Sequence, residues 1–211
     1  MSLEEVSALI LAGGRSRRMG VDKALLVLDG EPLLARVVRR VLPLAGEIIV
    51  SAREPRAYDA VLKLLAAPVR IVVDEFADAG PLAGLHAGLT AARHDLLLAL
   101  AVDLPFVDPG LLAHMIDLAG GFDAVVPRVP ASHGYTLELE PLHALYRRTC
   151  LPAIESHLRA GDRRMTSILD DVLTRYLQPH EITRIDPGFR SFANINTPED
   201  WEAAQSLAGP R

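Results

Sequence analysis

Residues 6–23, VSALILAGGRSRRMGVDK, decide the fold of this chain. The run Val6–Leu11 is short and mostly apolar, which predicts a buried strand that Gly13 and Gly14 bring to an end. A third glycine and four basic side chains follow: Gly20, Arg15, Arg17, Arg18 and Lys23. Glycines let a backbone approach a ligand closely, successive N–H groups donate to phosphate oxygens, and basic side chains neutralise their charge. The alternative is a turn with solvated arginines, but ligands bind at the carboxyl ends of strands in α/β sheets, which favours a phosphate-binding loop.

Short apolar runs alternate with segments of helical period over the first 126 residues. The predicted strands are Val6–Leu11, Glu47–Ser51, Val69–Val73, Leu96–Val102 and one that begins at Asp123–Val126. The predicted helices are Leu33–Leu42 with Pro32 at its start, Ala57–Ala66, Leu82–Ala92 and Pro109–Leu118. Strands that alternate with helices indicate a mostly parallel sheet, and strands that are apolar throughout indicate that both faces are covered.

The second half of the chain is less regular. It predicts strands at Pro141–Arg147 and Glu181–Ile185 and helices at Leu151–Arg159, Arg163–Leu173 and Pro198–Leu207. We expect a single domain over residues 1–211. Its fold class is α/β, a Rossmann-like three-layer fold with a mostly parallel central sheet flanked by helices.

Composition narrows the class of protein. Of 211 residues, half are hydrophobic and the net charge is −5, which is typical of a globular chain rather than a disordered or nucleic-acid-binding one. Cys150 is the single cysteine, so a disulfide framework is excluded and a cytoplasmic location is expected. No apolar run is long enough to span a membrane, and the acidic N-terminus does not resemble a secretory signal. The seven histidines form no ligand-spaced group, which makes a zinc site improbable.

The loop contains neither GxxxxGK[ST] nor GxGxxG. Its pattern LAGG-x-S-x-RMG-x-DK, residues 11–23, resembles nucleotidyltransferases of the nucleotide-diphospho-sugar-transferase type, and more closely the molybdenum cofactor guanylyltransferases, the MobA-like proteins. Three later segments resemble that family in the same order, with EPLHALY at residues 140–146 as a fourth. The three are DEFADAGPLAG (74–84), VDLPF (102–106) and FANINTPED (192–200).

Asp103 is the predicted metal ligand. It follows an apolar strand, and Mg²⁺ prefers one or two carboxylates together with phosphate oxygens and water. The alternative is a carboxylate that caps the following turn. Lys23 is expected to hold the nucleotide phosphates, and Arg15 is a second candidate for this role. These three residues, Arg15, Lys23 and Asp103, are the predicted catalytic residues.

The nucleotide site that the resemblance implies is larger. An Asp at position 74 lies against the base or ribose in the family, and small residues from Gly80 onward leave room for a purine. Ser51 stands where some relatives have Asn. Alternation would place Asn194 and Asn196 on one face of an extended segment, as ligands or as part of a structural turn. The predicted binding residues are Leu11, Ala12, Gly13, Gly14, Lys23, Ser51, Asp74, Gly80, Asp103, Asn194 and Asn196.

The resemblance implies transfer of GMP from GTP to the terminal phosphate of molybdopterin, with release of pyrophosphate and with Mg²⁺ as cofactor. The nucleotide-binding part would span about 6–127 and the acceptor-side part about 128–211, with a mobile loop at 128–139. A cytidylyltransferase for the same pterin and a sugar-phosphate nucleotidyltransferase are alternatives, as is a non-catalytic adaptor. Partners would be GTP and molybdopterin, with cofactor-assembly proteins or recipient enzymes beside them, and no nucleic acid or membrane. The chain would be a monomer or weak oligomer.

Overall fold

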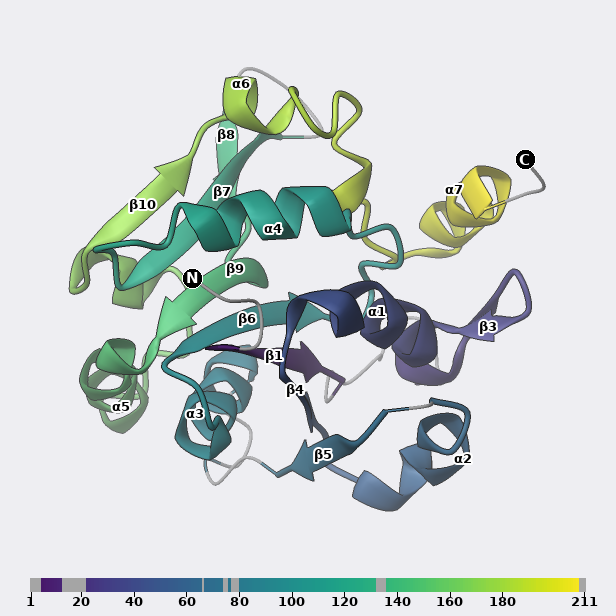
Figure 1. Cartoon of the computed structure of the whole chain (residues 1–211), viewed down its shortest axis with the longest axis horizontal. Helices are drawn as coiled ribbons and strands as arrows, with labels where there is room; N and C mark the ends of the chain where they lie inside the picture. The colour runs from purple at the N-terminus through teal and green to yellow at the C-terminus, as the bar shows by residue number, and fades with distance from the viewer. Residues whose placement is uncertain are drawn as a thin grey trace.

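The computed structural model describes residues 5–12, 22–65, 67–73, 76, 80–131 and 136–208. Its main sheet has the strand order β10-β7-β9-β6-β1-β4-β5, with β8 paired to β7 (Figure 1). The strands are β1 (Val6–Leu11), β4 (Glu47–Ser51), β5 (Val69–Val72), β6 (Leu96–Ala101), β7 (Ala124–Pro130), β8 (Leu137–Leu139), β9 (His143–Arg147) and β10 (Thr174–Leu177). Strands β5, β4, β1 and β6 run parallel, as do β7 and β10, whereas β9 is antiparallel to both of its neighbours. The mostly parallel sheet is therefore confirmed.

Helices cover both faces of this sheet. They are α1 (Leu33–Val41), α2 (Asp59–Leu62), α3 (Pro81–Ala91), α4 (Pro109–Asp117), α5 (Leu151–Arg159), α6 (Pro179–Ile182) and α7 (Pro198–Ala208). In β1, Ala8 and Ile10 pack into the core beneath α1 and α4, while Leu9 packs into the core beneath α3 and α5. All three side chains are completely buried, which is the reason these positions are apolar.

A third, smaller core lies at one side of the sheet. Strands β2 (Val27–Leu28) and β3 (Glu31–Pro32) form a short hairpin, and Leu28 packs there with Ile195 and Ala204. Figure 1 shows α7 beside this hairpin, at the end of the chain. The C-terminal segment is thereby packed against the residues that follow the glycine loop. Within the described residues, no helix has the length and apolar character that a membrane span requires.

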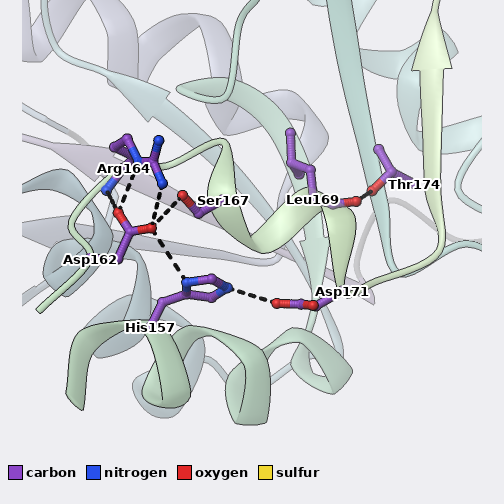
Figure 2. Close-up of polar contacts among 7 residues, drawn as sticks. All are labelled: His157, Asp162, Arg164, Ser167, Leu169, Asp171 and Thr174. Carbon is purple, nitrogen blue, oxygen red and sulfur yellow. Dashed lines mark hydrogen bonds and ion pairs between the residues drawn. The ribbon is translucent and has the colours of Figure 1, made fainter. Parts of the chain in front are cut away.

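Two predicted elements of the second half are wrong. The predicted helix Arg163–Leu173 is only a 3-10 turn over Ser167–Asp170. Figure 2 shows why: the Asp162 carboxylate accepts from Arg164 and from the Ser167 hydroxyl, and these bonds hold the segment in a polar turn. The predicted strand Glu181–Ile185 is instead helix α6 with the turn that follows it.

Helix α6 begins at Pro179, a residue that suits the first turn of a helix. The Glu181 carboxylate accepts from the Gln178 backbone N–H at 2.9 Å, which closes that turn. The strand of this region, β10, comes before α6 rather than after it.

In place of the expected helix Ala57–Ala66, the structure has a 3-10 turn over Pro55–Tyr58 followed by the short helix α2. The expected loop at 128–139 is bordered by strands, because Arg128 pairs with Leu139 where β7 and β8 run antiparallel. Residues 132–135 of that segment lie outside the described residues.

Candidate nucleotide-binding site

The carboxyl ends of β1 and β6 lie side by side at the point where the strand order reverses. From β1 the chain adds β4 and β5 on one side, and then crosses to β6 on the other side. The Val102 backbone N–H donates to the Leu11 carbonyl at 3.2 Å, and Ala12 donates to the Ser51 carbonyl at 2.9 Å. Open α/β sheets bind ligands outside such a switch point, so this edge is the candidate site.

Lys23, Asp103 and Asn196 meet at this edge. The Lys23 ammonium donates to Asp103 Oδ2 at 2.8 Å and to Asn196 Oδ1 at 2.7 Å. The side chains of Lys23 and Asp103 are 16% and 20% exposed, so a ligand can still reach both of them. The predicted catalytic pair is therefore brought together by the fold, and one of the two predicted asparagines joins it.

The turn that carries Lys23 is capped from within the motif. Asp22 Oδ1 accepts from the Ala24 backbone N–H at 3.0 Å, and a 3-10 turn over Lys23–Leu25 follows. Ala24 is completely buried, which anchors the turn against the core. The Asp22 side chain thereby satisfies a backbone donor at the start of the turn.

Asn196 is placed by its own backbone and by its neighbours. The Ile195 N–H donates to the Asp103 carbonyl at 3.0 Å, and the buried Ile195 side chain fixes the segment below. Thr197 Oγ1 accepts from the Asp200 N–H, while Asp200 Oδ2 accepts from the N–H groups of Asn196 and Thr197. These bonds cap the start of α7 and hold Asn196 toward Lys23.

This cap has an electrostatic signature. Burial by itself would raise the pKa of Asp200, but the backbone N–H donors of Asn196 and Thr197 outweigh it and hold that pKa below its ordinary value. Asp200 therefore stays charged beside the backbone donors it satisfies. Asn194, by contrast, is exposed at the surface, so the fold does not bring the two asparagines to the same contact.

The start of α3 provides open space at the same edge. Gly80 has φ +70° and ψ −155°, a conformation that strongly favours glycine, and a Cβ added to it would meet no atom of the described residues within 4 Å. Ser51 lies deeper: it is buried, and its hydroxyl is 3.0 Å from where a Cβ on Gly84 would stand. A small residue at position 84 thus lets α3 pack closely on β4. The absence of a side chain at Gly80 leaves space at the start of α3.

Four predicted site residues lie outside the described residues: Gly13, Gly14, Arg15 and Asp74. Of the predicted residues that the structure does describe, Leu11, Ala12 and Gly80 border the candidate site.

Glu140 is a member of this neighbourhood that the sequence did not single out as a site residue. Burial, together with the nearby carboxylates of Glu138 and Asp103, raises its pKa from 4.5 to about 7. Glu140 precedes β9, and the antiparallel pairing of β9 with β6 carries it back to the edge where Asp103 lies. The sequence signal, a glutamate before a predicted strand, does not specify this neighbour, because it does not set the strand direction.

The oxygen donors at this edge suit a hard cation. The Lys23 ammonium already lies between a carboxylate oxygen of Asp103 and an amide oxygen of Asn196. Among the described residues, no group of three or more His, Cys, Asp or Glu side chains is arranged to hold a metal ion. A single carboxylate is nevertheless sufficient for Mg²⁺ that is bound together with substrate phosphates and water.

Comparisons with known proteins agree over almost the whole chain. A family model described as a MobA-like NTP transferase domain matches residues 8–179. A probable molybdenum cofactor guanylyltransferase of Methanosarcina acetivorans is 38% identical over 206 residues, covering 93% of this chain and 88% of that protein. A molybdenum cofactor guanylyltransferase of Syntrophotalea carbinolica is 34% identical over 196 residues, covering 93% of this chain and 89% of that protein.

Solved structures share the architecture. The molybdopterin-guanine dinucleotide biosynthesis protein A of Archaeoglobus fulgidus superposes with a TM-score of 0.77 at 27% identity, covering 95% of this chain and 97% of that one. The 2-C-methyl-D-erythritol 4-phosphate cytidylyltransferase of Thermus thermophilus superposes with a TM-score of 0.71 at 22% identity, covering 97% and 98% of the two chains. The second likeness concerns the fold alone.

Proposed function

The chain belongs to the MobA-like NTP transferases, and from this premise we propose that it transfers GMP from GTP to the terminal phosphate of molybdopterin and releases pyrophosphate. The observation that carries the proposal is the contact of Lys23 with Asp103 at the switch point of the sheet. A basic side chain for phosphate and a carboxylate for a metal ion lie 2.8 Å apart there, in a family whose members are nucleotidyltransferases.

The reaction exchanges one phosphorus–oxygen bond for another. An oxygen of the acceptor phosphate bonds to the α-phosphorus of GTP, the bond from that phosphorus to the oxygen bridging the β-phosphate breaks, and pyrophosphate leaves. Such a transfer depends on positioning and charge neutralisation more than on acid–base groups. The proposed task of Lys23 is to leave Asp103 and bind the triphosphate oxygens.

Asp103, with Asn196 beside it, would hold Mg²⁺, whose positive charge neutralises phosphate oxygens. Asp103 is suited to this role because its carboxylate is accessible and already pairs with the Lys23 ammonium. Arg15, Gly13 and Gly14 would bind phosphate oxygens beside Lys23. Leu11, Ala12, Ser51, Asp74 and Gly80 would line the nucleoside side, with Asn194 at the outer edge.

The division of labour along the chain follows from this arrangement. We propose that residues from about 6 to 127 bind the nucleotide and that residues from about 128 to 211 bind the acceptor. Asn196 is the exception, because it reaches back to Lys23 from the second part. Glu140 also belongs to the second part and lies close enough to Asp103 for the two carboxylates to repel each other, and under this proposal it belongs to the acceptor side.

The test is a pyrophosphate-release assay with purified molybdopterin and each of the four nucleoside triphosphates in turn. GTP should be preferred over CTP by at least about 10²-fold in kcat/KM, since the acceptors of a site that pairs the guanine donors are left unsatisfied by another base. Preference for CTP would assign the chain to the cytidylyltransferases. Tight GTP binding without pyrophosphate release would instead indicate an adaptor, and the Asp103→Asn variant serves as the inactive control.

A further inference from the structure

The buried hydroxyl of Tyr58 contacts the residues on either side of positions 13–21. Tyr58 ends the 3-10 turn Pro55–Tyr58, and its side chain is 3% exposed. Its hydroxyl oxygen is 2.7 Å from Asp22 Oδ2 and 3.2 Å from the Ala12 carbonyl oxygen. These two residues flank positions 13–21, so a single hydroxyl contacts the residue on either side of that segment.

The nearer acceptor connects Tyr58 to the site. Asp22 receives the hydroxyl at Oδ2 and the Ala24 N–H at Oδ1, so both carboxylate oxygens are engaged. The turn capped in this way presents Lys23 to Asp103. Two hydrogen bonds therefore connect the buried Tyr58 hydroxyl, through the Asp22 carboxylate, to the backbone of the turn that carries Lys23, the side chain that binds phosphate under the proposed function.

The hydroxyl is kept in its donor form. Burial, with the hydrogen bond to Asp22 and the charge of that carboxylate, raises the pKa of Tyr58 above its ordinary value. The phenol thus stays protonated wherever the enzyme is folded, and Asp22 is always offered a proton to accept.

We propose that Tyr58 is a positioning residue of the nucleotide site: its hydroxyl orients Asp22, and Asp22 orients the turn that holds Lys23 on Asp103. Tyr58 touches none of the reacting atoms and acts through Asp22. The proposal rests on the proposed function only for its consequence in nucleotide binding. The positioning of Lys23 itself can be tested without GTP.

The sequence permits a direct test, because Lys23 and Lys63 are its only two lysines. In the folded protein Lys23 is largely buried between two oxygen acceptors, whereas Lys63 is exposed. Brief acylation of amines, quantified on each lysine by mass spectrometry, therefore carries an internal reference. Tyr58→Phe removes the hydroxyl alone and should raise the labelling rate of Lys23 at least about threefold, with that of Lys63 unchanged.

Two comparisons separate positioning from a general loss of stability. Tyr146→Phe also removes a buried hydroxyl, one that donates to the Pro141 carbonyl at 2.7 Å, and it should leave the labelling of Lys23 unchanged at a comparable loss of Tm. Asp22→Ala should raise Lys23 labelling on its own, and adding Tyr58→Phe to it should have no further effect. Unchanged Lys23 labelling in Tyr58→Phe, or additive effects in the double variant, would overturn the proposal.

Binding of Mg²⁺–GTP, measured by calorimetry, then reports the consequence. Tyr58→Phe should weaken GTP about fivefold and leave the KM for molybdopterin unchanged. If the wild-type protein bound no GTP, the proposed function would fail while the labelling result stood. If the wild type and Tyr58→Phe bound GTP equally well, the positioning role would be refuted and the proposed function would stand.

Discussion

Two polar clusters of this protein are built in opposite ways. At the sheet edge, Lys23 bonds to Asp103, 80 residues away, and to Asn196, 173 residues away. Beside α5, His157 lies 2.7 Å from Asp171, only 14 residues on, and 3.6 Å from Asp162 (Figure 2). Asp162 also accepts from Arg164 and Ser167, two and five residues further along the chain.

The two clusters differ in what their bonds hold. The local cluster closes one turn, and its polar groups satisfy one another at the surface. The long-range cluster joins the glycine loop, a strand end and the C-terminal segment, so it forms only when the whole sheet has formed. The side chains of Lys23 and Asp103 also remain partly exposed to solvent. Their ion pair can therefore open, so that each side chain binds a ligand instead. We expect substitutions in the long-range cluster to affect activity, and substitutions in the local cluster to affect only local stability.

The largest expected effect is on Asp103. Asp103→Asn keeps the size of the side chain and removes the charge that would bind Mg²⁺. The rate of pyrophosphate release at limiting Mg²⁺ should fall by about 10²-fold or more, with little change in Tm because the side chain lies at the edge of the sheet. A near wild-type rate would remove Asp103 from the metal site.

Lys23→Ala should follow in size. It removes the ammonium that the phosphates would bind, and it leaves the Asp103 carboxylate without its cation. GTP binding and turnover should both fall, by about 30-fold in kcat/KM. Titration of GTP binding and steady-state rates check this, with Lys63→Ala as the matched surface control. Equal behaviour of the two lysine variants would make Lys23 a surface residue.

The two asparagines refine the comparison. Asn196→Ala removes an acceptor from Lys23 and should lower kcat/KM about fivefold, whereas Asn194→Ala at the exposed position should change it less than twofold. Steady-state kinetics on both variants, at equal Tm, decide between them. A larger effect from Asn194 would indicate that it binds the acceptor directly.

Glu140 links the site to pH. Its folded pKa of about 7 exceeds its ordinary 4.5, so the folded protein binds more protons than the unfolded one between these values. Stability should therefore decrease as pH rises from 4.5 to 7 and then level off. Glu140→Gln removes this pH dependence of stability. The difference in Tm, variant minus wild type, should therefore increase by about 5 °C between pH 5 and pH 8. A difference in Tm that does not change with pH would show that the pKa of Glu140 is not raised by folding.

The smallest effect is expected in the local cluster. Hydrogen bonds from Arg164 and Ser167 lower the pKa of Asp162, so its contribution to stability is present above its ordinary pKa of 3.8 and is lost as pH falls through the lowered value. Asp162→Asn should reduce Tm at pH 7 by at most about 4 °C, should differ less from wild type in strong acid, and should leave GTP turnover unchanged. Loss of turnover would show that this cluster also supports the site.

The first half of the chain was predicted well because its signals are local. The runs at Val6–Leu11 and Glu47–Ser51 became β1 and β4 with the same bounds, since both faces of these strands are buried and most of their residues are apolar. In the second half, side-chain bonds override the hydrophobic pattern. The turn around Asp162 and the α6 cap at Glu181 each depend on one polar contact that a periodicity count does not register.

The sequence by itself determined the fold class, the place of the loop after β1, and the family, because burial patterns and glycine positions are written in consecutive residues. It also identified Lys23 and Asp103 as separate candidates. Only the tertiary structure decided that they touch, that Asn196 joins them while Asn194 does not, and that Glu140 and Tyr58 lie close by. Strand order and direction set these neighbours, and they follow from how the sheet packs as a whole rather than from any one segment.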